Sequence, residues 1–416
     1  MERIKRLAAH PDIISGLEFI RQDREFILEK QIELVQIPAP SNHEKEKALR
    51  FAHLLQEVEL GEVVVDDIFN VYVIVKGEGG GPRIAISAHS DTVFPKETNL
   101  TVTQDADGTL HAPGIADDTR GMVEILSIAR AVKAAKLKPV GDIILCCNVG
   151  EESLGDLKGV RKLCGTFPDL DAFITVDTAN AGTVIYNGTG GNLYRVFFTG
   201  KGGHSFVNYG MPNPANAAAR AVARFAELRL PEKPKTTINV GLLRGGTAPN
   251  AIPSEVMITV DARSNGQIEL NDLDEKMRSI IAAAVDEENS RWGSDEKVSF
   301  RLEPVTLRPA ATQPFEAPIV QTALECLKAL NIPYLPRKDG ASCTDANWAM
   351  HLGIPALALG RGGQAGNGHS VNEWFRPTEE YLGPQKDLLI LFALAGLDGV
   401  SQPILIKRTD QLQDKE

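Results

Sequence analysis

The sequence predicts an α/β protein with a mixed central sheet flanked by helices and a smaller ferredoxin-like domain inserted into it. Two observations predict this fold. Apolar stretches typical of buried strands alternate with amphipathic helices up to about residue 190 and again after about residue 306. Between them, the predicted order is strand, helix, strand, strand, helix, strand, which is the split βαβ arrangement. We therefore expect one domain at 1–190 and 307–416, and an inserted domain at 191–306.

The first domain begins with helices. Apolar residues recur at helical spacing from Ile14 to Val35, and Pro38-Ala39-Pro40 ends this segment. Ser41-Asn42-His43-Glu44 then has the pattern of a capping box, which predicts the start of the next helix. The elements expected after it are strands at 63–65, 71–75 and 84–87, a helix at 120–136 and a buried strand at 142–149.

The pattern of the inserted domain begins near Asn192. Asn213 precedes Pro214, a pair that predicts the N-terminus of an Ala-rich helix. The domain is expected to contain strands at 193–198, 237–243, 256–262 and 298–302 and helices at 214–230 and 271–287. The larger domain then resumes with a helix at 319–330, a strand at 356–359 and a final helix at 384–397.

Composition narrows the class of protein. A chain of 416 residues is long enough for two or three domains, and 43% hydrophobic and 24% charged residues are typical of a globular protein. A net charge of −11 argues against nucleic acid or an anionic membrane as partner. Five irregularly spaced cysteines favour a reducing compartment, and neither a signal peptide nor a run of 18 apolar residues is found. These features predict a soluble, cytoplasmic protein.

Side chains that bind metals follow the predicted strands. Acids and imidazoles occur at the ends of apolar runs or in a Gly-rich loop, and they are His89, Asp91, Asp117, Asp118, Glu151, Glu152, Asp177 and His369. Because the ends of neighbouring strands meet at one edge of a sheet, these groups are expected to converge. Imidazoles and carboxylates can together hold a pair of divalent cations.

Each pair also has a purely structural interpretation. On an extended backbone His89 and Asp91 face the same side, so Asp91 can accept the second ring N–H of His89 and orient it. Alternatively, this segment is a solvated turn. Asp117 and Asp118 can equally be N-caps of the helix that follows. Two adjacent acids at the end of a buried strand are costly unless partnered, so Glu151-Glu152 favours one metal ligand and one group that reaches bound water.

Six segments in order resemble one known family. They are SAHSDT (87–92), GIADD (114–118), GEES (150–153), GGHS (202–205), GGTAPNAIP (245–253) and DAR (261–263). The chain resembles, over about residues 30–400, the dinuclear zinc peptidases that include peptidase T, glutamate carboxypeptidase, aminoacylase and succinyl-diaminopimelate desuccinylase. The resemblance implies a catalytic metal-binding domain and an inserted lid or dimerisation domain.

The resemblance also implies a role for each matched residue. One zinc ion would be held by His89 and Asp177 and the other by Glu152 and His369. Asp117 would bridge the two ions and be joined to Asp118 by a cis peptide bond. The remaining implied roles are general base for Glu151, orientation of His89 for Asp91, and substrate binding for His204, Asn250 and Arg263. In this family the residue that matches His204 often acts from the neighbouring subunit of a dimer.

The chemistry follows from these roles. Two such cations polarise a scissile carbonyl and lower the pKa of a water molecule towards ~7, and Glu151 takes the water proton and passes it to the leaving amine. In this family the position that matches 177 tends to be Asp in aminopeptidases and dipeptidases and Glu in carboxypeptidases and deacylases, so Asp177 favours release of an N-terminal residue. The pattern is most similar to peptidase T. Two departures are Arg120, where relatives often have Lys, and ASCTD (341–345) in place of Gly-Gly-Thr-Ser-Asp.

The sequence therefore predicts a zinc aminopeptidase or tripeptidase that hydrolyses short peptides. Two Zn²⁺ ions are expected per subunit, with Co²⁺ or Mn²⁺ as possible substitutes, and a homodimer through the inserted domain is possible. The alternatives are a zinc carboxypeptidase or N-acyl-amino-acid amidohydrolase of the same family, and an inactive binding or scaffold protein.

Overall fold

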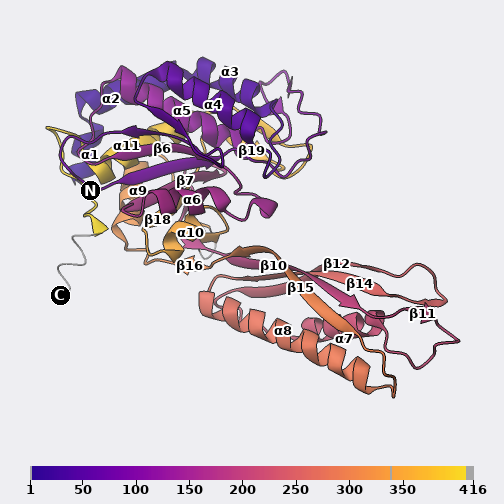
Figure 1. Cartoon of the computed structure of the whole chain (residues 1–416). Helices are drawn as coiled ribbons and strands as arrows, with labels where there is room; N and C mark the ends of the chain where they lie inside the picture. Colours follow the sequence, from indigo (N-terminus) through magenta and orange to yellow (C-terminus); the bar gives the residue numbers. More distant parts are fainter. Residues whose placement is uncertain (1, 338–339, 409–416) are drawn as a thin grey trace, which may run out of the picture. The chain divides into compact units, whose positions relative to one another are not determined.

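The computed structural model describes residues 2–337 and 340–408. The chain forms two compact units, which are shown in Figure 1. Unit 1 comprises residues 1–188 and 313–416, and unit 2 is the intervening segment Thr189–Thr312. Within the described residues, no helix combines the length and the apolar character that crossing a membrane requires.

Unit 1 is built on a seven-stranded sheet in the order β1-β2-β6-β3-β7-β18-β8. The strands are β1 (Val63–Val65), β2 (Val71–Val75), β3 (Ile84–His89), β6 (Ile143–Asn148), β7 (Ala172–Thr178), β8 (Val184–Ile185) and β18 (Ala356–Gly360). The four central strands, β6, β3, β7 and β18, run parallel. The outer strands β1, β2 and β8 pair antiparallel. The predicted mixed central sheet is therefore confirmed.

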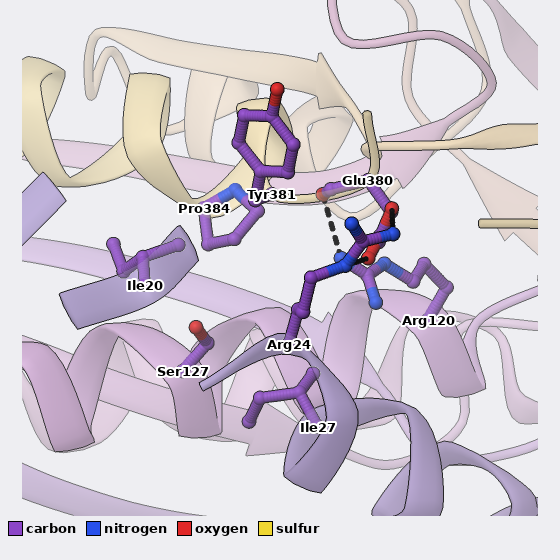
Figure 2. A pocket seen from close by; sticks show the side chains of 8 residues that line it. All are labelled: Ile20, Arg24, Ile27, Arg120, Ser127, Glu380, Tyr381 and Pro384. Carbon is purple, nitrogen blue, oxygen red and sulfur yellow. Dashed lines mark hydrogen bonds and ion pairs between the residues drawn. The ribbon is translucent and has the colours of Figure 1, made fainter. Parts of the chain in front are cut away.

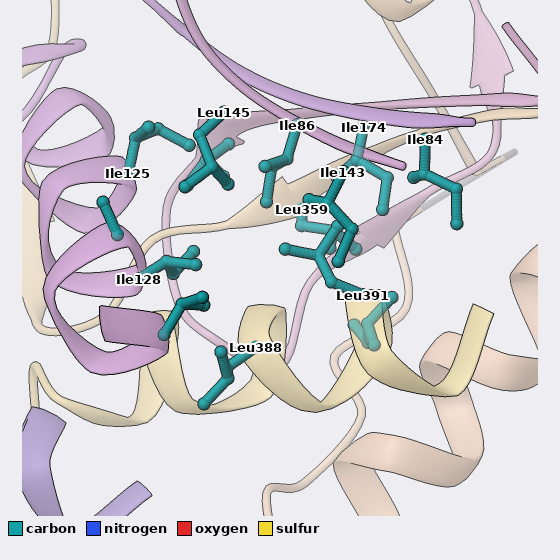
Figure 3. Packing of buried hydrophobic residues seen from close by; sticks show 14 of the residues in the cluster. Ile84, Ile86, Ile125, Ile128, Ile143, Leu145, Ile174, Leu359, Leu388 and Leu391 are labelled. Carbon is teal, nitrogen blue, oxygen red and sulfur yellow. The ribbon is translucent and has the colours of Figure 1, made fainter. Parts of the chain in front are cut away.

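Helices surround this sheet. They are α1 (Glu2–Ala8), α2 (Pro11–Gln22), α3 (Arg24–Val35), α4 (Lys45–Val58), α5 (Thr119–Ala134), α6 (Lys158–Thr166), α9 (Pro318–Ala329), α10 (Ala346–His351) and α11 (Leu382–Ala395). Figure 3 shows the apolar side chains of α5 and α11 packed against alternate residues of the central strands, among them Ile84 and Ile86 of β3. Each such buried side chain contributes about 1.5–3 kcal/mol relative to exposure. This packing fixes the sheet whose strand ends carry the site.

Two local predictions about the N-terminal helices were wrong. The segment from Ile14 to Val35 is two helices rather than one, separated at Asp23, whose carboxylate accepts hydrogen bonds from Arg130 Nε and Nη2 at 2.6 and 2.8 Å. Ser41 does not cap the next helix, because α4 begins only at Lys45 with Glu44 as its N-cap. The Ser41 hydroxyl instead donates to Asp91 Oδ2 at 2.7 Å. In both places the side chain concerned has a partner far away in the chain.

Unit 2 is a four-stranded antiparallel sheet with two helices on one face. Its elements are β10 (Gly190–Thr199), α7 (Pro214–Glu227), β12 (Thr236–Gly245), β14 (Glu255–Ser264), α8 (Gln267–Ser290) and β15 (Ser299–Arg308). The sheet order β12-β14-β10-β15 is that of the ferredoxin-like arrangement, so this prediction is confirmed. Its core contains Val196 and Phe198 of β10 together with Met277 and Ile281 of α8. A short ribbon of β11 (Gly203–His204) and β13 (Ala251–Ile252) completes the unit.

Candidate metal centre

The first half of the site forms where two neighbouring parallel strands end. His89 is the last residue of β3, and Asp177 lies at the same end of the adjacent strand β7. Asp117 precedes α5 and extends between them. His89 Nε2 lies 3.3 Å from Asp117 Oδ1 and 3.7 Å from Asp177 Oδ1. We call His89, Asp117 and Asp177 the first subsite.

The second half of the site lies on the other side of Asp117. His369 follows β19 (Gln364–Gly366) and has a positive φ of 62°, in the loop that the sequence describes as Gly-rich. Its Nε2 lies 3.2 Å from Asp117 Oδ2 and 2.8 Å from Glu152 Oε1. We call His369, Glu152 and Asp117 the second subsite. One oxygen of Asp117 thus faces each imidazole, and the structure brings all five predicted ligands together.

This donor set fits a pair of divalent cations. The donor atoms of His89, Asp117 and Glu152 lie within 4.8 Å of one another, as do those of His89, Asp118 and Asp177. Mixed imidazole and carboxylate donors suit zinc and similar transition metals. Of the two adjacent aspartates, we favour Asp117 as the ligand. Both oxygens of Asp118 accept backbone N–H groups, from His89 at 2.9 Å and from Gly121 at 3.2 Å.

Asp118 therefore stabilises the backbone around the site. It is fully buried and serves as the N-cap of α5 through its contact with Gly121. The peptide bond between Asp117 and Asp118 is cis, as the sequence resemblance implies. The structural alternative considered for this pair, two N-cap aspartates, thus describes Asp118 but not Asp117.

Asp91 joins the end of β3 to the turn after β6. The backbone carbonyl of Asp91 lies 3.0 Å from His89 Nδ1, and its carboxylate Oδ1 lies 3.5 Å from the same nitrogen. Asp91 Oδ1 also accepts the N–H of Glu151 at 2.9 Å, and Oδ2 accepts the N–H of Glu152 at 3.0 Å. Asp91 is therefore placed to orient His89, mainly through its main chain, and it also fixes the backbone of both glutamates.

Neighbouring groups in the centre favour the charged forms of its two imidazoles and of the Asp117 carboxylate. Hydrogen bonds to Asp117 and Glu152 raise the pKa of His369 to about 10. Burial opposes the charged form of His89, but Asp117, Asp177 and Asp91 raise its pKa well above the ordinary value. Burial likewise opposes the charge on Asp117, but neighbouring Arg361 and the two imidazoles hold its pKa well below the usual range. A metal ion entering the site must displace the imidazole protons.

Two further buried polar residues border the centre, and sequence reasoning missed both. Arg361 directly follows β18, and its Nη1 lies 3.3 Å from Asp117 Oδ1. The signal that could have found it is an Arg placed immediately after a buried strand in the Gly-rich loop of His369. Asp345 accepts a hydrogen bond from Asn148 Nδ2 at 2.7 Å, and burial raises the pKa of Asp345 to about 7. The sequence singles out the loop of Asp345, but not this interaction.

The three predicted substrate-binding residues lie at opposite ends of unit 2. His204 and Asn250 are neighbours, because β11 pairs with β13 and Ser205 N donates to Asn250 O at 2.9 Å. Arg263 lies near the end of β14, eight residues beyond Glu255 at its start, which corresponds to about 26 Å of strand. The structure thus brings His204 and Asn250 together but not Arg263.

Local contacts orient these side chains. His204 Nδ1 accepts the backbone N–H groups of Phe206 and Val207 at 3.3 and 3.4 Å, so in the neutral ring the proton resides on Nε2. The Arg263 side chain is 54% exposed, and its Nε donates to both carboxylate oxygens of Asp261 at 3.0 Å. His204 can therefore offer an N–H donor, and Arg263 a cation, to a bound molecule.

Arg120, which stands where relatives often have Lys, belongs to the support of the fold. Figure 2 shows it in a small crevice lined by Ile20, Arg24, Ile27, Arg120, Ser127, Glu380, Tyr381 and Pro384. Arg120 Nε donates to Glu124 at 2.8 Å and Nη2 donates to the carbonyl of Glu380 at 2.7 Å. None of the lining residues is a predicted ligand, so this crevice supplies no donor to the metal centre.

Known proteins resemble this chain in sequence and in fold. An uncharacterised protein of Bacillus subtilis, YqjE, is 26% identical over 349 residues, which cover 81% of this chain and 90% of that protein. The crystal structure of a tripeptidase from Staphylococcus aureus superposes with a TM-score of 0.73 at 23% identity, covering 88% of this chain and 96% of that one.

A second solved structure is that of YxeP from Bacillus subtilis, described as a dinuclear metal-binding peptidase of family M20. It superposes with a TM-score of 0.66 at 19% identity and covers 91% of this chain and 99% of that one. At these identities the structural matches show the fold alone. The sequence model of peptidase family M20/M25/M40 matches residues 85–393 of this chain. This chain belongs to peptidase family M20/M25/M40 and is a metallohydrolase of that family with a possible dinuclear metal site.

Proposed function

We propose that this chain is a zinc-dependent aminopeptidase that acts on short peptides such as tripeptides. The observation that carries the proposal is the position of Asp117, whose two oxygens face His89 and His369 at 3.3 and 3.2 Å. A carboxylate in this position can bridge two cations. Two further points support the choice of reaction, namely Asp at position 177 and the likeness of the fold to the Staphylococcus aureus tripeptidase.

The metal ligands proposed are those of the two subsites. His89 and Asp177 would hold one zinc ion, Glu152 and His369 the other, and Asp117 would contribute to both. When bound, such a pair of ions polarises the scissile carbonyl and acidifies a water molecule. Co²⁺ or Mn²⁺ could occupy the same donors, because imidazole and carboxylate groups accept several divalent metals.

Glu151 is proposed as the general base. It follows β6 directly beside Glu152, is only 5% exposed, and its backbone is fixed by the hydrogen bond to Asp91. With Glu152 as a metal ligand, the carboxylate of Glu151 would be the group that receives the proton of water. The same carboxyl group can then protonate the leaving amine.

His204, Asn250 and Arg263 are proposed to bind the substrate. The Nε2–H of His204 suits the oxygen that becomes negatively charged during hydrolysis, and the guanidinium of Arg263 suits a carboxylate. About 26 Å of strand separates Arg263 from the start of β14, next to which His204 and Asn250 lie. A tripeptide cannot span that distance, so one chain does not supply both groups to one substrate.

A homodimer through unit 2 is therefore part of the proposal. In such a dimer, His204 and Asn250 would serve the site of the partner. Two apolar surfaces of unit 2 support self-association. Phe206, Val207 and Tyr209, beside His204, are 85%, 75% and 78% exposed. The second surface is the edge strand β12, where Leu242 and Leu243 are 43% and 59% exposed, and such an edge is available to pair with another chain.

A substrate panel with zinc-loaded protein tests the proposed reaction. Tripeptides, N-acetylated tripeptides, N-acyl amino acids and peptides ending in glutamate would be compared for the parent and Glu151→Ala. We expect release of the N-terminal residue from tripeptides only, and no turnover by the variant. Cleavage confined to N-acyl or C-terminal glutamate substrates would assign the chain to the amidohydrolase or carboxypeptidase branch. A parent that binds no metal and is as inactive as the variant would indicate a scaffold protein.

A further inference from the structure

Arg361 is a buried cation beside the metal centre that the proposed reaction does not use. It follows β18, which runs parallel to β7, so its backbone N–H reaches Thr178 O at 2.7 Å. Its Nε donates to the same carbonyl at 3.3 Å, and its Nη1 donates to the carbonyl of Ala116. The side chain is only 11% exposed. The guanidinium is therefore held in one position.

The ionic contacts of Arg361 go to the carboxylates around the first subsite. Nη1 and Nη2 each lie 3.3 Å from Asp117 Oδ1, and Nη2 lies 3.5 Å from Asp177 Oδ1. Nη1 also lies 3.3 Å from Asp118 Oδ1. The oxygens of Asp117 and Asp177 are the same atoms that face His89 Nε2.

The second subsite is arranged differently. It uses the other oxygen of Asp117, Oδ2, which faces His369. Within the described residues, the ion pairs of Arg361 involve only Asp117, Asp118 and Asp177, so Glu152, the other carboxylate of the second subsite, forms none with it. A guanidinium remains charged at all physiological pH values. Arg361 therefore places a permanent positive charge against one subsite and not against the other.

We propose that Arg361 is a built-in counter-cation that lowers the metal affinity of the first subsite relative to the second. The inference rests on the dinuclear centre proposed above. A fixed cation that shares two ligand oxygens with a metal ion repels that ion and competes for the same lone pairs. The two ions are then bound unequally, and the ion at the first subsite is the one that exchanges more readily. In the metal-free protein the same cation stabilises Asp117, Asp118 and Asp177.

An opposite role for Arg361 makes a different prediction. If its hydrogen bonds chiefly hold Asp117 and Asp177 in position, removal of Arg361 would loosen the ligands and weaken metal binding. The sign of the change in affinity therefore distinguishes a competing charge from a structural support. Arg361→Gln removes the charge, whereas Arg361→Lys keeps the charge and loses the two-pronged geometry.

The experiment is a stepwise titration of the metal-free full-length protein with Zn²⁺ in the presence of a competing chelator. We expect the parent to bind two ions in unequal steps. Arg361→Gln should tighten the weaker step by about 10-fold or more, the scale of change that neighbours of a metal site produce. Arg361→Lys should leave the two steps unequal. In a His369→Ala background, which removes a ligand of the second subsite, the same tightening by Arg361→Gln would assign the weak step to the first subsite.

Several outcomes would overturn the inference. These are equal affinities in the parent, no change in Arg361→Gln, or weaker binding in that variant. Arg130→Gln is the matched control, because Arg130 forms a two-pronged pair with Asp23 away from the ligand set and should leave both steps unchanged. As a second measurement, Zn²⁺ should raise the Tm of Arg361→Gln more than that of the parent. A parent that binds no Zn²⁺ contradicts the proposed dinuclear centre itself, which is a distinguishable result.

Discussion

The carboxylate of Asp91 accepts the backbone N–H of Glu151 at 2.9 Å. This contact links two strands that lie side by side in the sheet, because Asp91 follows β3 and Glu151 follows β6. The second oxygen of Asp91 accepts the N–H of Glu152 at 3.0 Å and the hydroxyl of Ser41 at 2.7 Å. The Asp91 carboxylate thus positions the proposed base, Glu151, and the proposed ligand, Glu152, through their backbone N–H groups.

Replacing Asp91 should therefore reduce activity without unfolding the protein. Asp91→Asn presents an amide N–H₂ group to donors that require an acceptor, so it should be nearly as harmful as Asp91→Ala. We expect kcat/KM to fall by about 10- to 100-fold, as is usual for residues that orient metal ligands. Ser41→Ala removes one of the three donors and should have a smaller effect. Steady-state kinetics, with circular dichroism as a check on folding, measure both, and an Asp91→Asn enzyme with parental activity would contradict the assignment.

Adjacent glutamates should give different results when each is changed to glutamine. Glu151→Gln removes the proposed base, so kcat should fall by about 10²- to 10⁴-fold while zinc content stays at the parental value. Glu152→Gln removes a ligand that lies 2.8 Å from His369, and it should lower zinc content together with activity. Kinetics and elemental analysis of the two purified variants test this. Loss of zinc from Glu151→Gln, with retention in Glu152→Gln, would reverse the two roles.

The fold was largely predictable because its signals are local. Runs such as Ile84–Ile86 and Ile143–Leu145 are apolar throughout, as strands covered on both faces must be, and the structure places them in the sheet centre. The convergence of the proposed ligands was predictable for a related reason. Metal-type side chains lie at the ends of these strands or in the turns after them, and the parallel pairing of β3 with β7 brings His89 and Asp177 to the same edge.

What the sequence did not reveal depends on partners far away in the chain. Ser41 has the sequence signature of a helix cap, but the hydroxyl bonds to Asp91, 50 residues later. The break at Asp23 is held by Arg130, 107 residues later. Arg361 contacts Asp117, which lies 244 residues earlier. A pattern of neighbouring residues carries no information about such contacts. Local rules therefore predicted a helix cap at Ser41, an uninterrupted helix through Asp23 and no role for Arg361.

The buried Asp345 should produce a stability that depends on pH. Its Oδ1 has no hydrogen-bond partner among the described residues, and burial raises its pKa from 3.8 to about 7. The folded state therefore binds a proton more tightly than the unfolded state, so the stabilising contribution is present below pH 4 and is lost as the pH rises to about 7. Asp345→Asn, which stays neutral, should gain stability relative to the parent between pH 4 and pH 8.

Denaturant unfolding of the metal-free proteins at several pH values measures this difference. Asp142→Asn is a control with the opposite sign. Burial opposes the charge on Asp142, but hydrogen bonds from Gly77 N and from Arg83 lower its pKa below 3.8. That variant should lose stability relative to the parent as the pH rises through about 4. If Asp345→Asn and the parent differ by the same free energy at every pH, the pKa of Asp345 is the same in the folded and unfolded states.

The separation of His204 from Arg263 along unit 2 leads to a test by mixing inactive variants. If His204 serves the site of its partner, Glu151→Ala and His204→Ala chains should each be inactive alone. A heterodimer of the two contains one site with an intact Glu151 from one chain and His204 from the other. Random association makes half of the dimers mixed, with one active site of two, so co-expression should restore about a quarter of parental activity.

The control combines Glu151→Ala chains with Asp91→Asn chains. Both residues lie in the same site of unit 1, and in the parent the backbone N–H of Glu151 donates a hydrogen bond to the Asp91 carboxylate. No pairing of these chains assembles a complete site, so their activity should not recover beyond that of Asp91→Asn itself. Light scattering of the parent supplies the association state independently. A parent that is fully active as a monomer would contradict the proposed dimer but not the proposed metal centre. Dimers without recovery in the His204 mixture would instead place His204 in the site of its own chain, or outside any site, because exchange between partners is the only way these two defects can compensate each other.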